Sequence, residues 1–164
     1  MEHDILTFLD RAARAIARVR EIEDELHTII ANADGLKAVD TTRDKVCTSR
    51  KLDLCDLLIS VQTDVERNEK ALDRAKRAAK IYRAAVAEIA SYLMDPWERA
   101  IVITRWTGGV SWDEIAMGSG QSLSTVYRKR RAALKVLNEH HEVVDPIIEK
   151  AAADVEALYP VVVD

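Results

Sequence analysis

The stretch that decides the fold is DPWERAIVITRWTGGVSWDEIAMGSGQSLSTVYRKRRAALKVLN, residues Asp95–Asn138. It contains three helix-start signals, each followed by an apolar pattern. The first is Asp95 before Pro96, because a proline at the first helical position gives up no hydrogen bond. Glu98 follows Asp95 at the spacing of a capping box. We expect this helix to run to residue 106 and to end at the paired glycines 108–109.

The second and third signals are two serines. Ser111 opens a short helix, and Glu114 completes a second capping box. Gly118 and Gly120 are expected to end this helix after about two turns. Ser122 caps a third helix that runs to about residue 138. The inward stripe of this third helix consists of Val126, Ala133, Leu134 and Leu137.

A short helix, a glycine-containing turn and a longer helix are the pattern of a helix-turn-helix unit, whose second helix enters the DNA major groove. Charge supports this interpretation. Five basic and no acidic residues lie between Ser122 and Asn138, whereas the 164-residue chain has a net charge of −4. A basic run alone is more often a solvated helix face, but here two capped helices precede it. The basic residues are Arg128, Lys129, Arg130, Arg131 and Lys135.

The same stretch resembles region 4 of sigma-70-type factors, and most of all the sigma-like helix-turn-helix regulators of phages and prophages, the late-gene activator type. The resemblance covers about a quarter of the chain and departs from the family at Ser119, where Leu or Met is usual before the turn glycine. It implies a DNA-binding transcription regulator. The matching residues are Arg105-Trp106, Gly109, Ser111-Trp112-Asp113-Glu114-Ile115-Ala116, Gly120-Gln121-Ser122 and Val126.

The DNA-contacting face is expected on or near the side of the third helix opposite Val126 and Ala133. Short hydroxyl side chains and free N–H groups at the helix start suit phosphates or base edges. Arg128 is the candidate for bidentate recognition of a guanine, and Arg131 and Lys135 for phosphates. Trp106 and Trp112 are expected in the core. The predicted DNA-binding residues are Ser122, Leu123, Ser124, Thr125, Tyr127, Arg128, Arg131 and Lys135. Tyr127 packs on a sugar or a thymine methyl in this interpretation, although such a tyrosine is as often structural.

Residues 1–94 carry two segments with the 3.5-residue period of a coiled coil. The polar stretch Asn32–Arg50 is predicted to be a loop between them. The pattern leaves open an antiparallel hairpin within one chain or pairing between chains, and Asn68 is the kind of seam residue that fixes register. The first seam is Ile5, Leu9, Ala12, Ile16, Val19, Glu23 (or Ile22), Leu26 and Ile30. The second is Leu54, Leu58, Val61, Val65, Asn68, Leu72, Ala75, Ala79, Tyr82, Val86, Ile89 and Leu93.

The predicted fold is therefore all-α, with three parts. A long heptad-patterned hairpin or coiled coil (1–94) precedes the helix-turn-helix unit (95–141), and an acidic helical tail (142–164) follows. The tail carries one basic and six acidic residues. Asp145-Pro146 looks like its helix start, and its apolar face is Ile147, Ile148, Ala151, Val155 and Leu158.

Other functional classes find little support in the sequence. No segment is apolar enough for a membrane span, and the acidic start MEHD is unlike a signal peptide, so we expect a cytoplasmic protein. Cys47 and Cys55 match no zinc or redox motif, and His140-His141 are expected to be solvated or structural. We expect no metal, cofactor or catalysis.

Two alternatives compete with a regulator that binds double-stranded DNA and contacts RNA polymerase or a second copy through its helical arm or tail. One is the DNA-recognition small subunit of a phage terminase, which also joins a helix-turn-helix to a helical oligomerisation region and assembles as rings. The other is a coiled-coil scaffold whose basic helix is incidental. The oligomeric state distinguishes the regulator from the terminase subunit. Charge reversal at Arg128 and Arg131 tests the scaffold, which predicts no measurable change.

Overall fold

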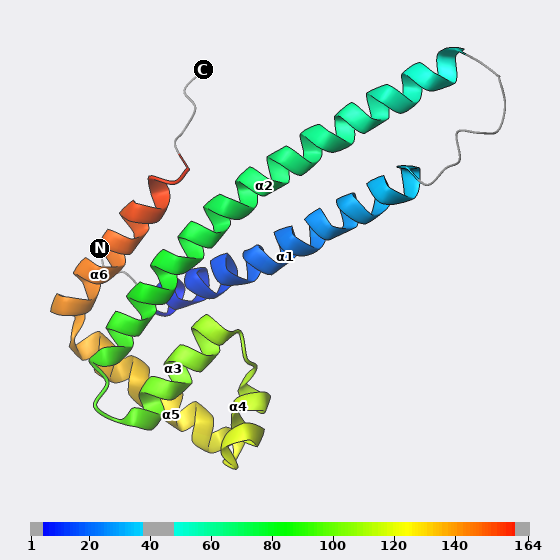
Figure 1. Cartoon of the computed structure of the whole chain (residues 1–164). Helices are drawn as coiled ribbons and strands as arrows, with labels where there is room; N and C mark the ends of the chain where they lie inside the picture. The colour runs from blue at the N-terminus through cyan, green and yellow to red at the C-terminus, as the bar shows by residue number, and fades with distance from the viewer. Residues whose placement is uncertain (1–4, 38–47, 160–164) are drawn as a thin grey trace. The chain divides into compact units, whose positions relative to one another are not determined.

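The structure is a computed structural model that describes residues 5–37 and 48–159, with side chains described for 5–34 and 56–159. This part of the chain contains six α-helices and no strand, which confirms the all-α prediction (Figure 1). The helices are α1 (Ile5–Lys37), α2 (Thr48–Ser91), α3 (Pro96–Gly108), α4 (Trp112–Ser119), α5 (Leu123–Glu139) and α6 (His141–Glu156). None of the described helices is both long and apolar enough to span a bilayer.

The contacts within the chain define two units. The first contains residues 1–18 and 74–164, and the second contains residues 19–73. Both α1 and α2 run across the boundary, so the start of α1 and the end of α2 belong with α3–α6. These units are not the three segments predicted from the sequence, whose boundaries stay a prediction.

The core of the first unit is aliphatic, with a few aromatic residues. Phe8 on α1 packs on Tyr82 of α2, with ring centroids 5.7 Å apart. Trp106 of α3 is 2% exposed, and its indole Nε1 donates a 2.9 Å hydrogen bond to Asp10 on α1. Burying a polar indole N–H without such a partner would be unfavourable. The main cluster is Ile5, Phe8, Leu9, Ala12, Tyr82, Ala85, Val86, Ile89, Ala90, Leu93, Val102, Trp106, Ala133, Leu137, Val144, Ile148 and Ala151.

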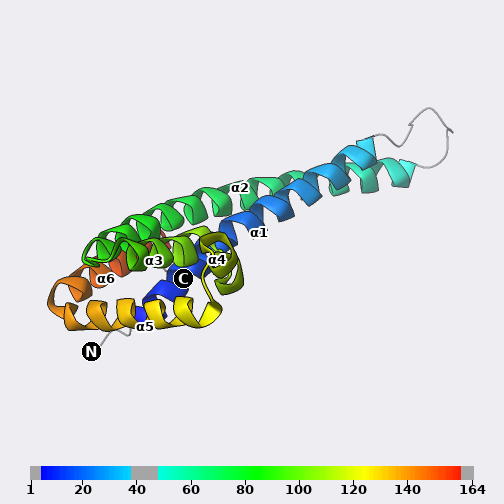
Figure 2. The ribbon, with the colours of Figure 1, turned by 90° about the horizontal axis from the view of Figure 1, so that it is seen from below.

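A second, smaller cluster forms where α3, α4 and α5 meet. It consists of Ile101, Ile115, Ala116 and Val126. Two helices therefore contribute to both clusters: α3 through Ile101 and Val102, and α5 through Val126 and Ala133. Figures 1 and 2 show α4 beside the start of α5.

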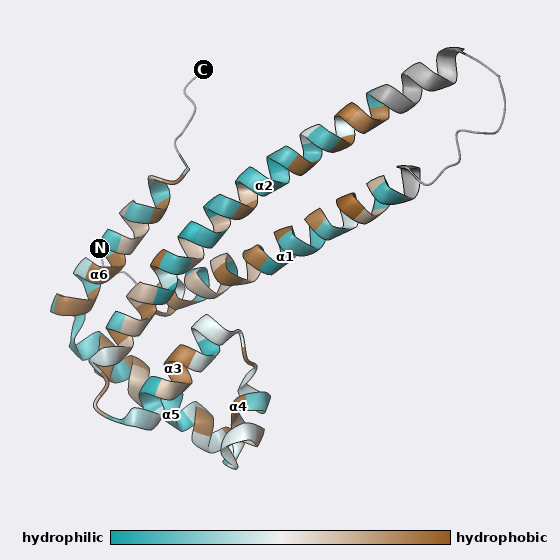
Figure 3. Ribbon diagram, in the orientation of Figure 1, coloured by the Kyte–Doolittle hydropathy of each residue, from teal (hydrophilic) through white to brown (hydrophobic). Residues whose placement is uncertain are grey.

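The heptad seam positions are buried in the first unit and mostly half-buried in the second. Hydrophobic segments recur along α1 and α2 between hydrophilic ones (Figure 3). In the first unit every seam position is buried: Ile5, Leu9, Ala12, Ile16, Ala75, Ala79, Tyr82, Val86, Ile89 and Leu93. In the second unit Val61, Val65, Asn68 and Leu72 are half-buried. In α1 Ile22 is buried, which agrees with the alternative to Glu23 at this seam position, whereas the predicted seam residue Ile30 is exposed.

Asn68 uses its side-chain amide within its own helix. Its Nδ2 donates to the backbone carbonyl of Asp64 at 2.9 Å. Helix extends into both ends of the stretch predicted as a loop, since α1 continues to Lys37 and α2 begins at Thr48. Residues 38–47, including Cys47, and the side chains of Leu54 and Cys55 lie outside the described part.

The start of the last helix differs from the prediction. α6 begins at His141 rather than at Asp145, and Pro146 lies inside it. Pro146 has no N–H and cannot make the helical bond to Glu142. The predicted apolar face is nevertheless turned inward: Ile148 and Ala151 are buried, and Ile147, Val155 and Leu158 are half-buried. Packing of this face explains why the helix tolerates a proline.

Leu93→Ala tests the packing of the first unit. Leu93 is fully buried and its neighbour Met94 is 89% exposed, so the pair provides a matched comparison. Leu93→Ala should lower the free energy of unfolding by about 2–5 kcal/mol, because it removes apolar contacts and leaves a cavity. Met94→Ala should change it by less than about 0.5 kcal/mol. Denaturant unfolding of the two variants measures both, and equal effects would contradict the packing described.

Candidate nucleic-acid interface

The predicted interface depends on how α4 and α5 are connected. Ser111 caps α4 through a complete capping box: its hydroxyl accepts from the N–H of Glu114, and Glu114 accepts from the N–H of Ser111 at 2.8 Å. The hydrogen bond from the Ser111 N–H is the main cause that lowers the pKa of the Glu114 carboxyl, and the hydrogen bond from the Ser111 hydroxyl lowers it further. The predicted start of α4 is thus confirmed.

The turn between α4 and α5 is closed by two backbone hydrogen bonds. Gly120 has φ +67° and donates to Met117, while Gln121 donates to Ala116. Only Gly120 ends the helix, because Gly118, predicted as a second stop, lies within α4. Ser119 stands where the sigma-like pattern has Leu or Met, and its hydroxyl donates to the carbonyl of Ile115 at 2.7 Å.

Ser122 is the N-cap of α5, as predicted. Its hydroxyl accepts from the N–H of Thr125 at 3.2 Å. It also lies 3.0 Å from the hydroxyl of Ser124 and 2.9 Å from that of Thr125. The three hydroxyls form one network at the start of α5. Any phosphate or base contact by these groups would extend this network.

The opposite faces of α5 differ sharply in burial. Val126, Ala133 and Leu137 are fully buried. The predicted contact residues occupy the other side and are exposed, except for half-buried Thr125: Ser122, Leu123, Ser124, Tyr127, Arg128, Arg131 and Lys135. From Ser124 onward their spacing follows the 3.6-residue period, so the structure places them on one face. Lys135 also approaches Glu139 at 3.8 Å, an exposed pair that contributes little to stability.

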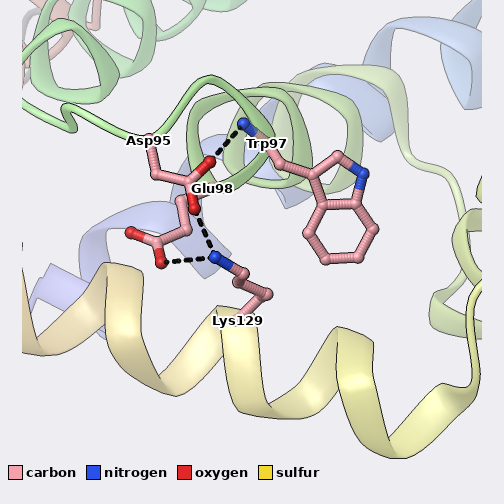
Figure 4. Close-up of polar contacts among 4 residues, drawn as sticks. All are labelled: Asp95, Trp97, Glu98 and Lys129. Carbon is pink, nitrogen blue, oxygen red and sulfur yellow. Dashed lines mark hydrogen bonds and ion pairs between the residues drawn. The ribbon is translucent and has the colours of Figure 1, made fainter.

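Lys129 is one of the basic residues of α5 that turn away from this face. Its ammonium contacts Asp95 and lies 3.4 Å from Glu98 (Figure 4). Asp95 at the same time accepts from the N–H of Trp97 at 2.8 Å, which confirms its predicted role as the cap of α3. Glu98 was expected to complete a capping box at this helix start. Its carboxylate, which is buried, instead accepts a hydrogen bond from Lys129.

This contact joins the start of α3 to the middle of α5. The hydrogen bond from Lys129 is the main cause that lowers the pKa of the Asp95 carboxyl, and the N–H of Trp97 lowers it further. The hydrogen bond to Asp95 in turn raises the pKa of Lys129. Both groups are therefore charged at neutral pH, and Lys129 is occupied within the fold.

Trp112, the first residue of α4, is the centre of an aromatic and cationic cluster. Its ring meets Trp106 edge-on at a centroid distance of 5.6 Å and lies 5.9 Å from Tyr127. The guanidinium groups of Arg105 and Arg130 lie 5.2 Å and 5.3 Å from the same ring centroid. Trp106 is buried, as predicted, but Trp112 is only half-buried.

Arg105 and Arg130 are not among the binding residues predicted from the sequence. Arg105 was visible in the Arg-Trp pair of the resemblance, and Arg130 was one of the basic run. Their common contact with Trp112 depends on how three helices meet, so no local spacing reports it.

Comparison of the chain with protein-family models, with curated proteins and with solved structures found no match. Among the described residues no three His, Cys, Asp or Glu side chains are grouped to hold a metal ion. The resemblance to sigma region 4 therefore stands on the residues quoted for it and remains a prediction.

Gly118, within α4, and Gly120, in the turn, should respond in opposite ways to substitution by alanine. A Cβ at either Gly118 or Gly120 meets no atom within 4 Å, so only the backbone distinguishes them. Gly118→Ala should stabilise the protein by about 0.5–1 kcal/mol, because alanine favours a helix interior. Gly120→Ala should destabilise it by about 1–2 kcal/mol, because it forces a Cβ into left-handed backbone. Thermal unfolding measures both, and shifts in the same direction would refute this turn geometry.

The Lys129 contact predicts a pH dependence. Because the pKa of Asp95 is lowered in the folded state, its contribution to stability is present above about pH 4 and is lost as the pH falls through the lowered value. Lys129→Met removes the main cause of this shift. The variant should therefore lose less stability than the parent protein on acidification from neutral pH.

The measurement is the unfolding midpoint of each protein over an acid pH series. Lys135→Met is the matched control, because Lys135 is exposed and pairs only weakly with Glu139. Parallel pH curves for the parent and Lys129→Met would show that Lys129 does not set the ionisation of Asp95.

Proposed function

We propose that this chain is a sequence-specific, DNA-binding transcription regulator that resembles sigma factor region 4 and is of phage or prophage type. In this proposal α4, the turn at Gly120 and α5 act as the helix-turn-helix unit, and α5 enters the major groove of double-stranded DNA. The arm (1–94) or the acidic tail (142–164) would contact RNA polymerase or a second copy of the chain.

The observation that carries the proposal is the exposed basic face of α5 opposite its buried stripe. Arg128 and Arg131 are exposed, and no described carboxylate forms an ion pair with either. A helix held on one side by the core and basic on the other, in a chain of net charge −4, suits a polyanionic partner. The capped start of α5 adds backbone N–H groups for phosphate contacts.

The first test is selection of bound DNA from a random library at two salt concentrations. A defined sequence motif, retained at the higher salt, supports a sequence-specific regulator. Failure to bind DNA even below about 50 mM salt, where phosphate contacts are strongest, would overturn the proposal.

A phage terminase small subunit is the second candidate, and the second unit favours it in one respect. Apolar side chains are exposed there at Ile30, Leu57 and Ile59. Such residues on long helices are suited to contacts between copies. Sedimentation of the full chain separates the two functions, since a large closed ring indicates the packaging protein and a monomer or dimer indicates the regulator.

Arg128→Ala and Arg131→Ala should affect DNA binding differently. Arg128→Ala should weaken binding to the selected motif by roughly 1–3 kcal/mol and relax the preference at one base pair, because a bidentate guanine contact is lost. Arg131→Ala should weaken binding to motif and random DNA equally and reduce the salt slope by about one.

The matched control for both is Arg83→Ala, which removes an exposed arginine from α2. Titrations of motif and random duplexes over several salt concentrations give all these quantities. If Arg128→Ala lowers both affinities by the same factor, Arg128 contacts only phosphate and the assignment of base recognition to it is wrong.

A further inference from the structure

Three helices of the first unit bring two arginines to one tryptophan. Arg105 comes from α3, Trp112 begins α4 and Arg130 comes from α5. Both guanidinium carbons lie within 5.3 Å of the Trp112 ring centroid, which is the range of a cation–π contact. All three side chains are half-buried, so each keeps a solvent-accessible part.

The positive charge at this ring has no acidic partner among the described residues. Arg105 donates to the backbone carbonyl of Val110 at 3.2 Å, which is a neutral acceptor. The Nε of Arg130 is buried and makes no hydrogen bond. The contrast with neighbouring Lys129, which contacts two carboxylates, is direct. Two cations near one ring make the potential there positive, and partial burial strengthens its effect.

A phosphate at this position would offset that charge and accept hydrogen bonds from the solvent-accessible parts of the two guanidinium groups. A guanidinium presents its donors in a planar fork that matches the oxygens of a phosphate. Stacking on Trp112 restricts each fork to few orientations, so little conformational entropy is lost on binding. Tyr127, which touches the same ring, belongs to the exposed face of α5 and connects the cluster to that face.

We infer that Arg105 and Arg130, stacked on Trp112, bind one backbone phosphate of the DNA duplex beside α5. This inference rests on the proposed function and adds to it a contact outside the predicted set. Phosphate contacts set the position and angle of a recognition helix without reading sequence. The pair would thus orient α5 while Arg128 and its neighbours read bases.

The experiment compares Arg105→Gln/Arg130→Gln with Arg105→Lys/Arg130→Lys in the full chain. The Gln pair should lower affinity for motif and random DNA by the same factor, about tenfold, and reduce the salt slope by about one. The Lys pair keeps the charge and should retain most of the slope. Arg83→Gln is the matched control, and an unchanged thermal midpoint verifies folding.

A second measurement uses neutral methylphosphonates at single positions of the selected duplex. One position should weaken binding of the parent protein and have no further effect on the Gln pair. If the double Gln variant does not fold, the single Gln variants are titrated against the same duplexes.

The outcomes distinguish the inference from the proposed function. If the parent binds DNA but a folded Gln variant keeps the parent's salt slope and methylphosphonate response, the cluster only packs the three helices, and the inference is wrong while the proposed function stands. If the parent binds no DNA, both are wrong.

Discussion

The burial of one stripe of α5 is the constraint on which the rest of the structure depends. Val126 closes the small cluster with α3 and α4, whereas Ala133 and Leu137 enter the main cluster with α1, α2 and α6. Because one rigid helix contributes to both clusters, its rotation about its own axis is determined twice. The opposite face, which carries Arg128 and Arg131, is therefore held outward by apolar packing. A loss of packing at either cluster would alter the presentation of that face.

Consecutive basic residues of α5 have different environments for the same reason. A helix turns by about 100° per residue, so neighbours in the run 128–131 point in different directions. Arg128 and Arg131 are exposed, Lys129 contacts Asp95 and Glu98, and Arg130 stacks on Trp112. The basic residues of this run therefore fall into three environments: an exposed basic face, an ion pair that joins α5 to α3, and a cationic cluster beside an aromatic ring. Counting basic residues overstates the charge available to a polyanion.

The seam residues of the long helices α1 and α2 are buried to different degrees in the two units. Seam residues in the first unit are fully buried because α3–α6 belong to the same unit and share its core. In the second unit the seam is only half-buried, and Ile30, Leu57 and Ile59 are exposed. A seam that its own unit covers incompletely is available for contacts with another chain, which is why oligomeric state bears so directly on the choice between the two candidate functions.

Local chemistry was enough to predict the all-α class, the caps at Asp95, Ser111 and Ser122, the left-handed glycines that end α3 and α4, and the apolar stripes. These features depend on hydrogen bonds and periodicity within a few residues, so the sequence by itself determined them. Three of the departures involve partners distant in sequence. Glu98 faces Lys129 rather than its own helix start, α6 tolerates Pro146 because its apolar face is packed, and Arg105 and Arg130 both contact Trp112. Only the tertiary structure decided these, because the energy of each contact depends on which distant helix supplies the neighbouring atoms.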